Sequence, residues 1–165
     1  MTGTPSRNFS VRSSVAETEE NLRHIHQAHS QILAQLRDLD QILAQIACYG
    51  EACRALHGFG AMGMRCAQLQ DCLAQHFRRE EALFNRLQAR RQETQAMVQT
   101  LTREHRTLER SLAILVLALK ALNTGDELPL SLYELEDETR ELIQTLERHI
   151  AAEKTLLPLL ETTST

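Results

Sequence analysis

Leucine and isoleucine recur at alternating intervals of three and four residues through four long stretches of the chain. This spacing places the apolar side chains on one face of an α-helix, where they pack against other helices. The connections between the stretches are short, which favours helices that run antiparallel to their neighbours. The pattern therefore predicts an all-α protein, an up-down-up-down antiparallel four-helix bundle. The expected helices cover about residues 15–49, 64–88, 94–122 and 133–160.

Helix breakers and caps set the expected boundaries. Residues 1–14 are rich in Ser and Thr, and we expect them to be disordered, with the bundle occupying residues 15–162. Ser14 and Glu17 have the spacing of a capping box, which predicts the start of the first helix there. Gly50 is expected to end that helix. The expected connections lie at residues 50–63, 89–93 and 123–129.

The composition excludes several classes of protein. Only 4% of the residues are aromatic, which argues against an all-β sandwich or barrel. The net charge is −4 and Arg residues alternate with acidic ones, so we expect no nucleic-acid partner. The longest apolar run, residues 112–119, is too short to cross a membrane. Residues 1–14 lack the apolar core of a signal peptide, which indicates a cytoplasmic protein.

Each predicted helix interrupts its leucine pattern with residue types that bind metals. Two helices carry a His followed four residues later by a Glu, which puts both side chains on one helix face. At about 1.5 Å per residue, all the interruptions lie at one height, roughly 11–23 Å from one end of the bundle. Burying two carboxylates and four imidazoles without a cation would be costly, so the pattern predicts a shared metal site. The candidate ligands are His29, His76, Glu80, His105, His149 and Glu153.

The candidate ligands indicate which metal binds and how many ions the site holds. Four imidazoles and two carboxylates exceed what one tetrahedral zinc needs, and no thiolate lies at this height. Glu80 and Glu153 can each bridge two metals, which leaves two His for each metal and open positions besides. Imidazole and carboxylate suit iron, and open positions suit small ligands such as O2, NO or peroxide. The residue types leave two zinc or two manganese ions as alternatives.

Two segments of nine and ten residues carry a specific resemblance. The segments HFRREEALF, from His76, and HIAAEKTLLP, from His149, resemble the two H-x-x-x-E signatures of the hemerythrin-like (HHE cation-binding) family. His29 and the pair Glu104-His105 resemble the single-His helices of that family. The resemblance covers about residues 20–160. It implies an Fe–O–Fe type centre of two iron ions, with one iron on His29 and His76, the other on His105 and His149, and Glu80 and Glu153 bridging.

Two differences separate the chain from the oxygen-carrying hemerythrins. Those proteins have a second His on the third helix, where this chain has Leu101 and Glu109, four residues to either side of His105. Their fourth-helix carboxylate is an Asp at the position of Lys154. The set is more similar to the four-His, two-Glu site of iron–sulfur repair proteins, although we expect no counterpart of the Cys-containing N-terminal domain that those proteins usually carry.

Three functions follow as hypotheses. The first is a non-haem diiron protein that binds, senses or handles O2, NO or peroxide, or that stores iron and donates it to an acceptor protein. The second is a diiron enzyme that reduces peroxide or NO, which uses the same open site. The third is a metal-free helical interaction module.

Some residues with reactive side chains stand outside this site. His26 precedes His29 by one helical turn and is expected at the surface, with hydrogen bonding to a ligand as the alternative. His24 is expected to face solvent, and His57 has no assigned role. Four cysteines show no C-x-x-C spacing and are expected to be reduced thiols, with a redox pair or soft-metal site as the alternative. They are Cys48, Cys53, Cys66 and Cys72.

Overall fold

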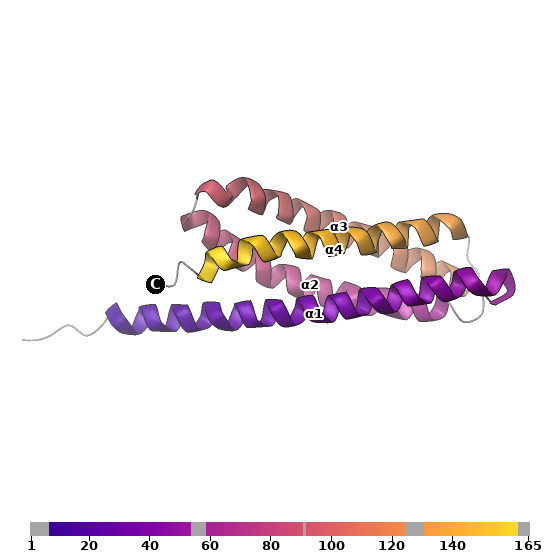
Figure 1. The fold of residues 1–165 in the computed structure, drawn as a ribbon, viewed down its shortest axis with the longest axis horizontal. Helices are drawn as coiled ribbons and strands as arrows, with labels where there is room; N and C mark the ends of the chain where they lie inside the picture. The colour runs from indigo at the N-terminus through magenta and orange to yellow at the C-terminus, as the bar shows by residue number, and fades with distance from the viewer. Residues whose placement is uncertain (1–6, 54–58, 91, 125–130, 162–165) are drawn as a thin grey trace, which may run out of the picture.

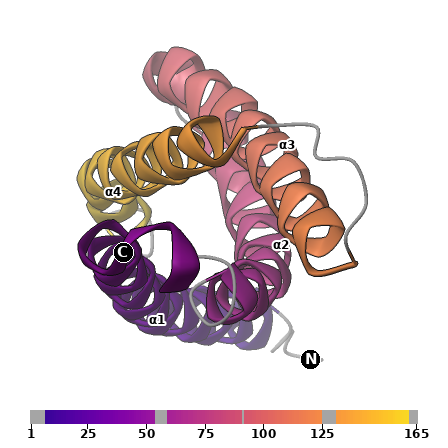
Figure 2. The ribbon, with the colours of Figure 1, turned by 90° about the vertical axis from the view of Figure 1, so that its right-hand side faces the viewer.

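The fold is a bundle of four long helices (Figures 1 and 2). The structure is a computed structural model and describes residues 7–53, 59–90, 92–124 and 131–161. Along the chain α1 (Arg7–Cys53), α2 (Phe59–Arg90), the short 3-10 helix η2 (Gln92–Thr94), α3 (Gln95–Thr124) and α4 (Leu132–Glu161) follow one another. Consecutive helices run in opposite directions, and α1 also packs against α4, which closes the ring seen end-on in Figure 2. The predicted all-α, up-down-up-down bundle is confirmed.

Helix α1 is longer at both ends than the sequence predicts. It begins at Arg7, so residues 7–14, expected to be disordered, are helical, and the expected cap at Ser14 lies inside the helix. Residues 1–6 lie outside the described part of the chain. The upstream segment contains neither Gly nor Pro, and extending an existing helix costs far less than nucleating one. Gly in a helix costs about 1 kcal/mol relative to Ala, which is also less than the cost of nucleation. The helix therefore continues through Gly50 and ends at Cys53.

Helix α2 also begins earlier than predicted. Gly60 and Gly63, expected in a loop, lie in its first turns. Phe59 and Met62 are completely buried at this end of the bundle, and burying side chains of this size favours the helix by about 1.5–3 kcal/mol each. That gain exceeds the helix propensity lost at two glycines. Residues 54–58, with the rest of the expected loop and His57, lie outside the described residues.

A capping box sets the start of α4. The backbone N–H of Glu134 donates to Oγ of Ser131 at 3.2 Å, and the backbone N–H of Ser131 donates to Oε2 of Glu134 at 2.7 Å. Each side chain thus satisfies a backbone donor that the first helical turn leaves free. Pro158 lies within the last turn of the helix. The bend between α2 and α3 was predicted at residues 89–93, and η2 occupies that place.

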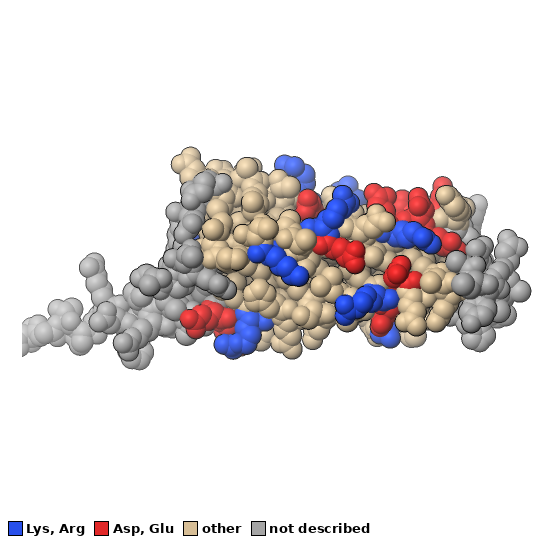
Figure 3. Space-filling model, in the orientation of Figure 1, with Lys and Arg blue, Asp and Glu red and all other residues tan. Residues whose placement is uncertain are grey.

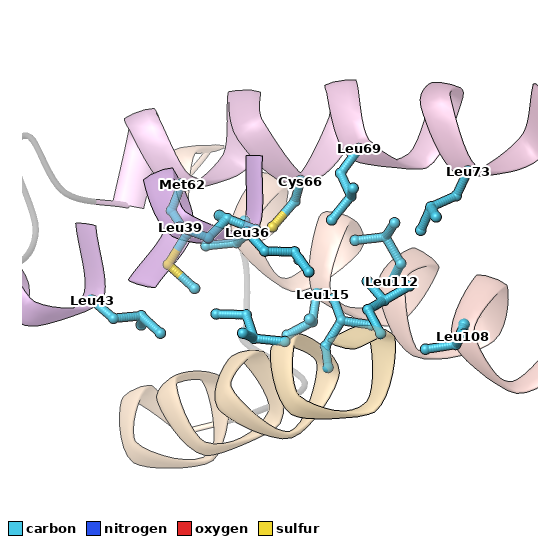
Figure 4. Close-up of a cluster of buried hydrophobic side chains, with 14 of the residues drawn as sticks. Leu36, Leu39, Leu43, Met62, Cys66, Leu69, Leu73, Leu108, Leu112 and Leu115 are labelled. Carbon is cyan, nitrogen blue, oxygen red and sulfur yellow. The ribbon is translucent and has the colours of Figure 1, made fainter. Parts of the chain in front are cut away.

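The apolar core is divided into two clusters along the bundle axis. The large cluster, shown in part in Figure 4, fills the end where α1 meets α2 and contains Leu36, Leu39, Met62, Cys66, Leu69, Leu112 and Leu115. The small cluster fills the other end and contains Leu22, Ile25, Leu83, Phe84, Leu87, Val98, Leu101, Leu156 and Leu157. On every helix the residues between the two clusters are the buried His and Glu residues that interrupt the leucine pattern. The fold therefore encloses a polar layer between two apolar ones.

Charged side chains of both signs are scattered among other residues on the outside of the bundle. On the face shown in Figure 3, Lys and Arg alternate with Asp and Glu, and neither sign forms a continuous stripe. None of the described helices combines the length and the apolar character needed to cross a membrane.

Candidate metal centre

The six residues predicted as ligands lie together in the middle of the bundle. Glu80 and Glu153 are completely buried, and the four imidazoles are at most 2% exposed. They come from all four helices, and each stands at a position where the helix would otherwise bury a leucine. The structure thus brings together every residue of the predicted site. The six residues are His29, His76, Glu80, His105, His149 and Glu153.

Their ligand atoms form two groups that share both carboxylates. One group is His29, His76, Glu80 and Glu153, and the other is Glu80, His105, His149 and Glu153. In each group the four ligand atoms lie within 4.8 Å of one another. The division into two His pairs with two shared Glu residues is the one that the family resemblance implies.

The two oxygens of each carboxylate face different His pairs. Oε1 of Glu80 lies 3.2 Å from Nε2 of His29 and 3.1 Å from Nε2 of His76, while its Oε2 lies 3.5 Å from Nε2 of His105. Glu153 is arranged in the opposite sense. Its Oε2 lies 3.0 Å from Nε2 of His29, while its Oε1 lies 3.4 Å from Nε2 of His105 and 2.7 Å from Nε2 of His149. A carboxylate placed in this way can bridge two cations.

Several buried polar atoms of the layer lack a hydrogen-bond partner among the described residues. They include both ring nitrogens of His76, Nδ1 of His29 and Oε2 of Glu80. Leaving a buried polar atom unsatisfied costs about 1–3 kcal/mol, so native proteins rarely keep several in one place. A cation bound by the inward-facing nitrogens and oxygens would satisfy two of these atoms, Nε2 of His76 and Oε2 of Glu80. The donor set therefore fits a metal.

In the metal-free protein the pKa values of the two carboxyl groups are shifted in opposite directions. Burial, and then the nearby charge of Glu153, raises the pKa of Glu80 well above its ordinary value. Burial also opposes ionisation of Glu153, but hydrogen bonds from the imidazoles, first that of His105, outweigh burial and lower its pKa. Two buried carboxylates repel each other unless one stays protonated or a cation lies between them.

The imidazoles are not equivalent either. Burial, reinforced by the neighbouring imidazoles against the opposing charge of Glu153, lowers the pKa of His76 to about 3, so this ring is neutral at physiological pH. Burial also favours the neutral form of His149, but the carboxylates of Glu153 and Glu104 outweigh it and raise the pKa of this ring. A metal needs the neutral imidazole, so its binding at His149 competes with a proton.

Two glutamates outside the predicted set contact candidate ligands at Nδ1, the ring nitrogen that faces away from the shared carboxylates. Nδ1 of His105 lies 3.2 Å from Oε1 of Glu81, and Nδ1 of His149 lies 2.7 Å from Oε2 of Glu104. Sequence reasoning missed both, because a partly exposed Glu on a helix has the pattern of an ordinary surface charge. The available signal was adjacency, since Glu81 follows Glu80 and Glu104 precedes His105.

Two phenylalanines surround His105. The ring of Phe77 is stacked on the imidazole with 3.9 Å between centroids, and the ring of Phe84 lies 6.0 Å away in a similar orientation. Phe77 also meets His149 edge-on, with 5.8 Å between centroids. These apolar rings fix the orientation of the imidazole and exclude water from that side of the site.

The other two histidines of the described residues lie outside the layer. His26 is exposed, as predicted for a surface position, with its ring centroid 6.4 Å from that of His29. His24 is partly exposed and its Nε2 lies 2.9 Å from Oε1 of Glu20. Cys66 is buried in the large cluster and Cys72 is partly buried, and both are free thiols. The side chains of Cys48 and Cys53 lie outside the described residues.

Comparison with known protein families matches residues 17–160 to the hemerythrin HHE cation binding domain. The chain belongs to this hemerythrin family. Neither the comparison with curated proteins nor that with solved structures gave a match. A buried group of His and Glu residues together with this family membership makes the chain a hemerythrin-type metal-binding protein.

The positions at which oxygen-carrying hemerythrins differ contribute no further ligand in this hemerythrin-like chain. Leu101 is buried in the small cluster, on the apolar side of the layer. Glu109 and Lys154 are exposed on the outside of the bundle. None of these three described positions therefore adds a candidate ligand to the four-His, two-Glu cluster.

Proposed function

We propose that the protein is a cytoplasmic non-haem diiron protein that binds, senses or handles O2, NO or peroxide, or stores iron and donates it to an acceptor protein. The observation that carries the proposal is the pair of ligand groups that share Glu80 and Glu153. Each group offers two imidazoles and two carboxylate oxygens, which leaves positions open on a metal that takes more than four ligands.

In this proposal each of the six residues has a defined position relative to the two irons. His29 and His76 hold one iron, His105 and His149 hold the other, and Glu80 and Glu153 hold both. The bound irons would supply reversible electron transfer and open positions for a small ligand. Burial keeps the imidazole of His76 neutral, and the apolar clusters on both sides of the layer exclude bulk water from it.

The donor types favour iron among the candidate metals. A structural zinc site would be tetrahedral and would typically include thiolates, whereas this layer has six N and O donor residues and no Cys among the described residues. Two zinc or two manganese ions remain the alternative occupants. Metal analysis after purification identifies the bound element. Visible absorption gives a second test, because we expect iron, and not zinc or manganese, to respond to O2 or NO.

Burial of the site favours small ligands over large substrates. All six ligand side chains are at most 3% exposed. A diatomic molecule or peroxide can reach such a site through small fluctuations of the helices, whereas a larger organic substrate would need the bundle to open. A metal-free interaction module gains no support from four buried imidazoles that face two buried carboxylates.

The test is to load the full chain with Fe²⁺ without oxygen and to add O2, NO and peroxide to separate samples. We expect the visible spectrum to change with at least one of the three, and a Glu109→Gln chain, altered at an exposed residue of α3, to respond equally. Recovery on removing the ligand indicates carriage or sensing, and repeated consumption of peroxide or NO indicates the enzymatic alternative. Loss of iron to an added chelator without any spectral response indicates storage and donation. A chain that binds iron no better than an Ala variant of His105 overturns the proposal.

A further inference from the structure

The outward-facing nitrogens of the four imidazoles have different environments in the two His pairs. In His105 and His149, Nδ1 faces a carboxylate oxygen, of Glu81 at 3.2 Å and of Glu104 at 2.7 Å. In His29 and His76, Nδ1 is buried without a hydrogen-bond partner among the described residues. One half of the site therefore has an outer layer of carboxylates, and the other half does not.

Hydrogen bonding at Nδ1 matters because Nε2 is the nitrogen that faces the shared carboxylates in all four rings. A metal on Nε2 requires the tautomer that carries its proton on Nδ1. A carboxylate that accepts a hydrogen bond from Nδ1–H fixes the tautomer and the ring orientation and makes Nε2 a stronger metal ligand. An Nδ1–H that is buried without an acceptor disfavours this tautomer, because the ring loses a hydrogen bond that it makes in water.

The supporting glutamates also connect the helices across the bundle. Glu81 of α2 contacts His105 of α3, and Glu104 of α3 contacts His149 of α4. Both glutamates are partly exposed, 43% and 40% of the side chain, so their charge stays hydrated while one oxygen reaches the buried ring. This arrangement holds both imidazoles of one pair in place in the metal-free protein.

We infer that the two metal positions are unequal, and that Glu81 and Glu104 are positioning residues that make the His105/His149 position the tighter one and the first to be filled. This inference rests on the proposed function, because it assumes two metals at the six-residue site. It assigns a role to two residues that touch no metal. The His29/His76 position then holds its metal more weakly and is the one that exchanges it with solution or with an acceptor.

The test uses Co²⁺ as the probe, because its binding changes the visible spectrum and it is less readily oxidised than Fe²⁺. The metal-free full chain is titrated with Co²⁺ in competition with a chelator, which yields the affinity of each of the two steps. Glu81→Ala and Glu104→Ala are compared with Glu109→Ala, which removes an exposed Glu of the same helix as Glu104. Far-ultraviolet circular dichroism verifies that each chain remains helical.

We expect the wild-type chain to bind two Co²⁺ ions in unequal steps. Glu81→Ala and Glu104→Ala should each weaken the tighter step by about 10- to 100-fold, and Glu109→Ala should change neither step. Glu104→Gln, which keeps an acceptor oxygen, should lose less affinity than Glu104→Ala. Equal steps in the wild type, or a tighter step that neither Ala variant changes, would overturn the inference while leaving a two-metal site in place. Binding of fewer than two ions would overturn the proposed function as well.

Single-histidine variants locate the tighter step. In a His76→Ala chain, one Co²⁺ should still bind at nearly the wild-type first affinity, and adding Glu104→Ala should weaken it. In a His149→Ala chain, only weak binding should remain, and Glu104→Ala should have no further effect, because its partner ring is gone. The reverse pattern overturns the inference. So does loss of all binding in both chains, because the two positions would then fill as one unit.

Discussion

The phenyl ring of Phe77 lies parallel to the imidazole of His105, with 3.9 Å between their centroids and 9° between their planes. Phe77 follows His76 in the sequence, so adjacent residues of α2 serve the two halves of the site in different ways. His76 belongs to the ligand group that contains His29, whereas Phe77 packs against His105 of the other group. Apolar packing therefore contributes to ligand orientation as well as to the stability of the fold.

Replacement of Phe77 by Leu should weaken metal binding while the bundle remains folded. The stacked ring is lost but most of the apolar volume stays, so His105 gains freedom to rotate. We expect metal affinity to fall about 2- to 10-fold, which corresponds to about 0.5–1.5 kcal/mol for an aromatic pair. The control is Phe59→Leu, a buried Phe near the start of α2 and more than four helical turns from His76. It should lower the melting temperature without changing the metal affinity.

Replacement of Glu80 by Gln should stabilise the metal-free chain and abolish most of the stabilisation by metal. Burial and Glu153 raise the pKa of Glu80, so its charge is unfavourable in the metal-free fold. Gln removes that cost and also a bridging oxygen. At free metal of about 100 times the dissociation constant, the wild type should gain about 2.7 kcal/mol, and the variant much less. Chemical unfolding with and without metal measures both effects, and a metal-free variant less stable than the wild type would contradict the account.

The difference between these two chains should grow with pH. The folded carboxyl of Glu80 has its pKa raised above the ordinary value of 4.5, so between the two values the folded wild type holds a proton that the unfolded chain has released. The free energy of unfolding of the wild type therefore falls as the pH rises through that window, whereas the glutamine amide of the Glu80→Gln chain does not titrate there. Denaturant unfolding of both metal-free chains from pH 5 to pH 8 tests the sign. A difference that shrinks with rising pH would count against it.

Much of the site was predictable because a buried polar residue in a leucine pattern has few explanations. His105 stands between Leu101 and Leu108, where only a buried side chain fits the helical spacing. Glu81 has no such sequence pattern, because partly exposed glutamates are common on helices. Its role depends on its contact with the ring of His105 on another helix. Long-range contacts of this kind do not follow from the spacing along one helix.

The helix boundaries show a different limit of local patterns. The spacing Ser-x-x-Glu occurs at Ser14 and at Ser131, yet only the second starts a helix. Ser131 follows Pro129 and Gly125, whereas the segment before Ser14 holds no breaker back to residue 6. A cap therefore starts a helix where helix breakers precede it in the sequence, and otherwise the helix continues through it.

The thiol of Cys66 should resist alkylation in the folded protein. Burial in the large cluster raises its pKa to about 12, so almost no thiolate exists at pH 8, and the thiolate is the reactive form. Burial also raises the pKa of Cys72, but this side chain is partly exposed and should react faster than Cys66. Peptide mass spectrometry after brief alkylation of native and denatured protein gives the rates. Equal native rates at the two cysteines would be inconsistent with the packing.

Metal loading should slow hydrogen exchange most at the end of the bundle that holds the small cluster. The polar layer separates this cluster from the large one, so the metal-free protein lacks a continuous apolar core between the two ends. A metal bound by residues from all four helices would connect the small cluster to the large one. We expect protection to rise at residues 22–29, 83–87, 98–105 and 153–157. Protection confined to the large cluster would contradict this description.

In the proposed function, six side chains from four helices hold two metal ions. The most direct measurement is the ratio of iron to protein chain after anaerobic loading with Fe²⁺ and removal of excess metal. We predict a ratio of two for the wild type, no more than one after His105→Ala and His149→Ala are combined, and still two for Glu109→Gln. A wild-type ratio below one, or a ratio that the combined variant leaves unchanged, would show that these six side chains do not hold two metal ions.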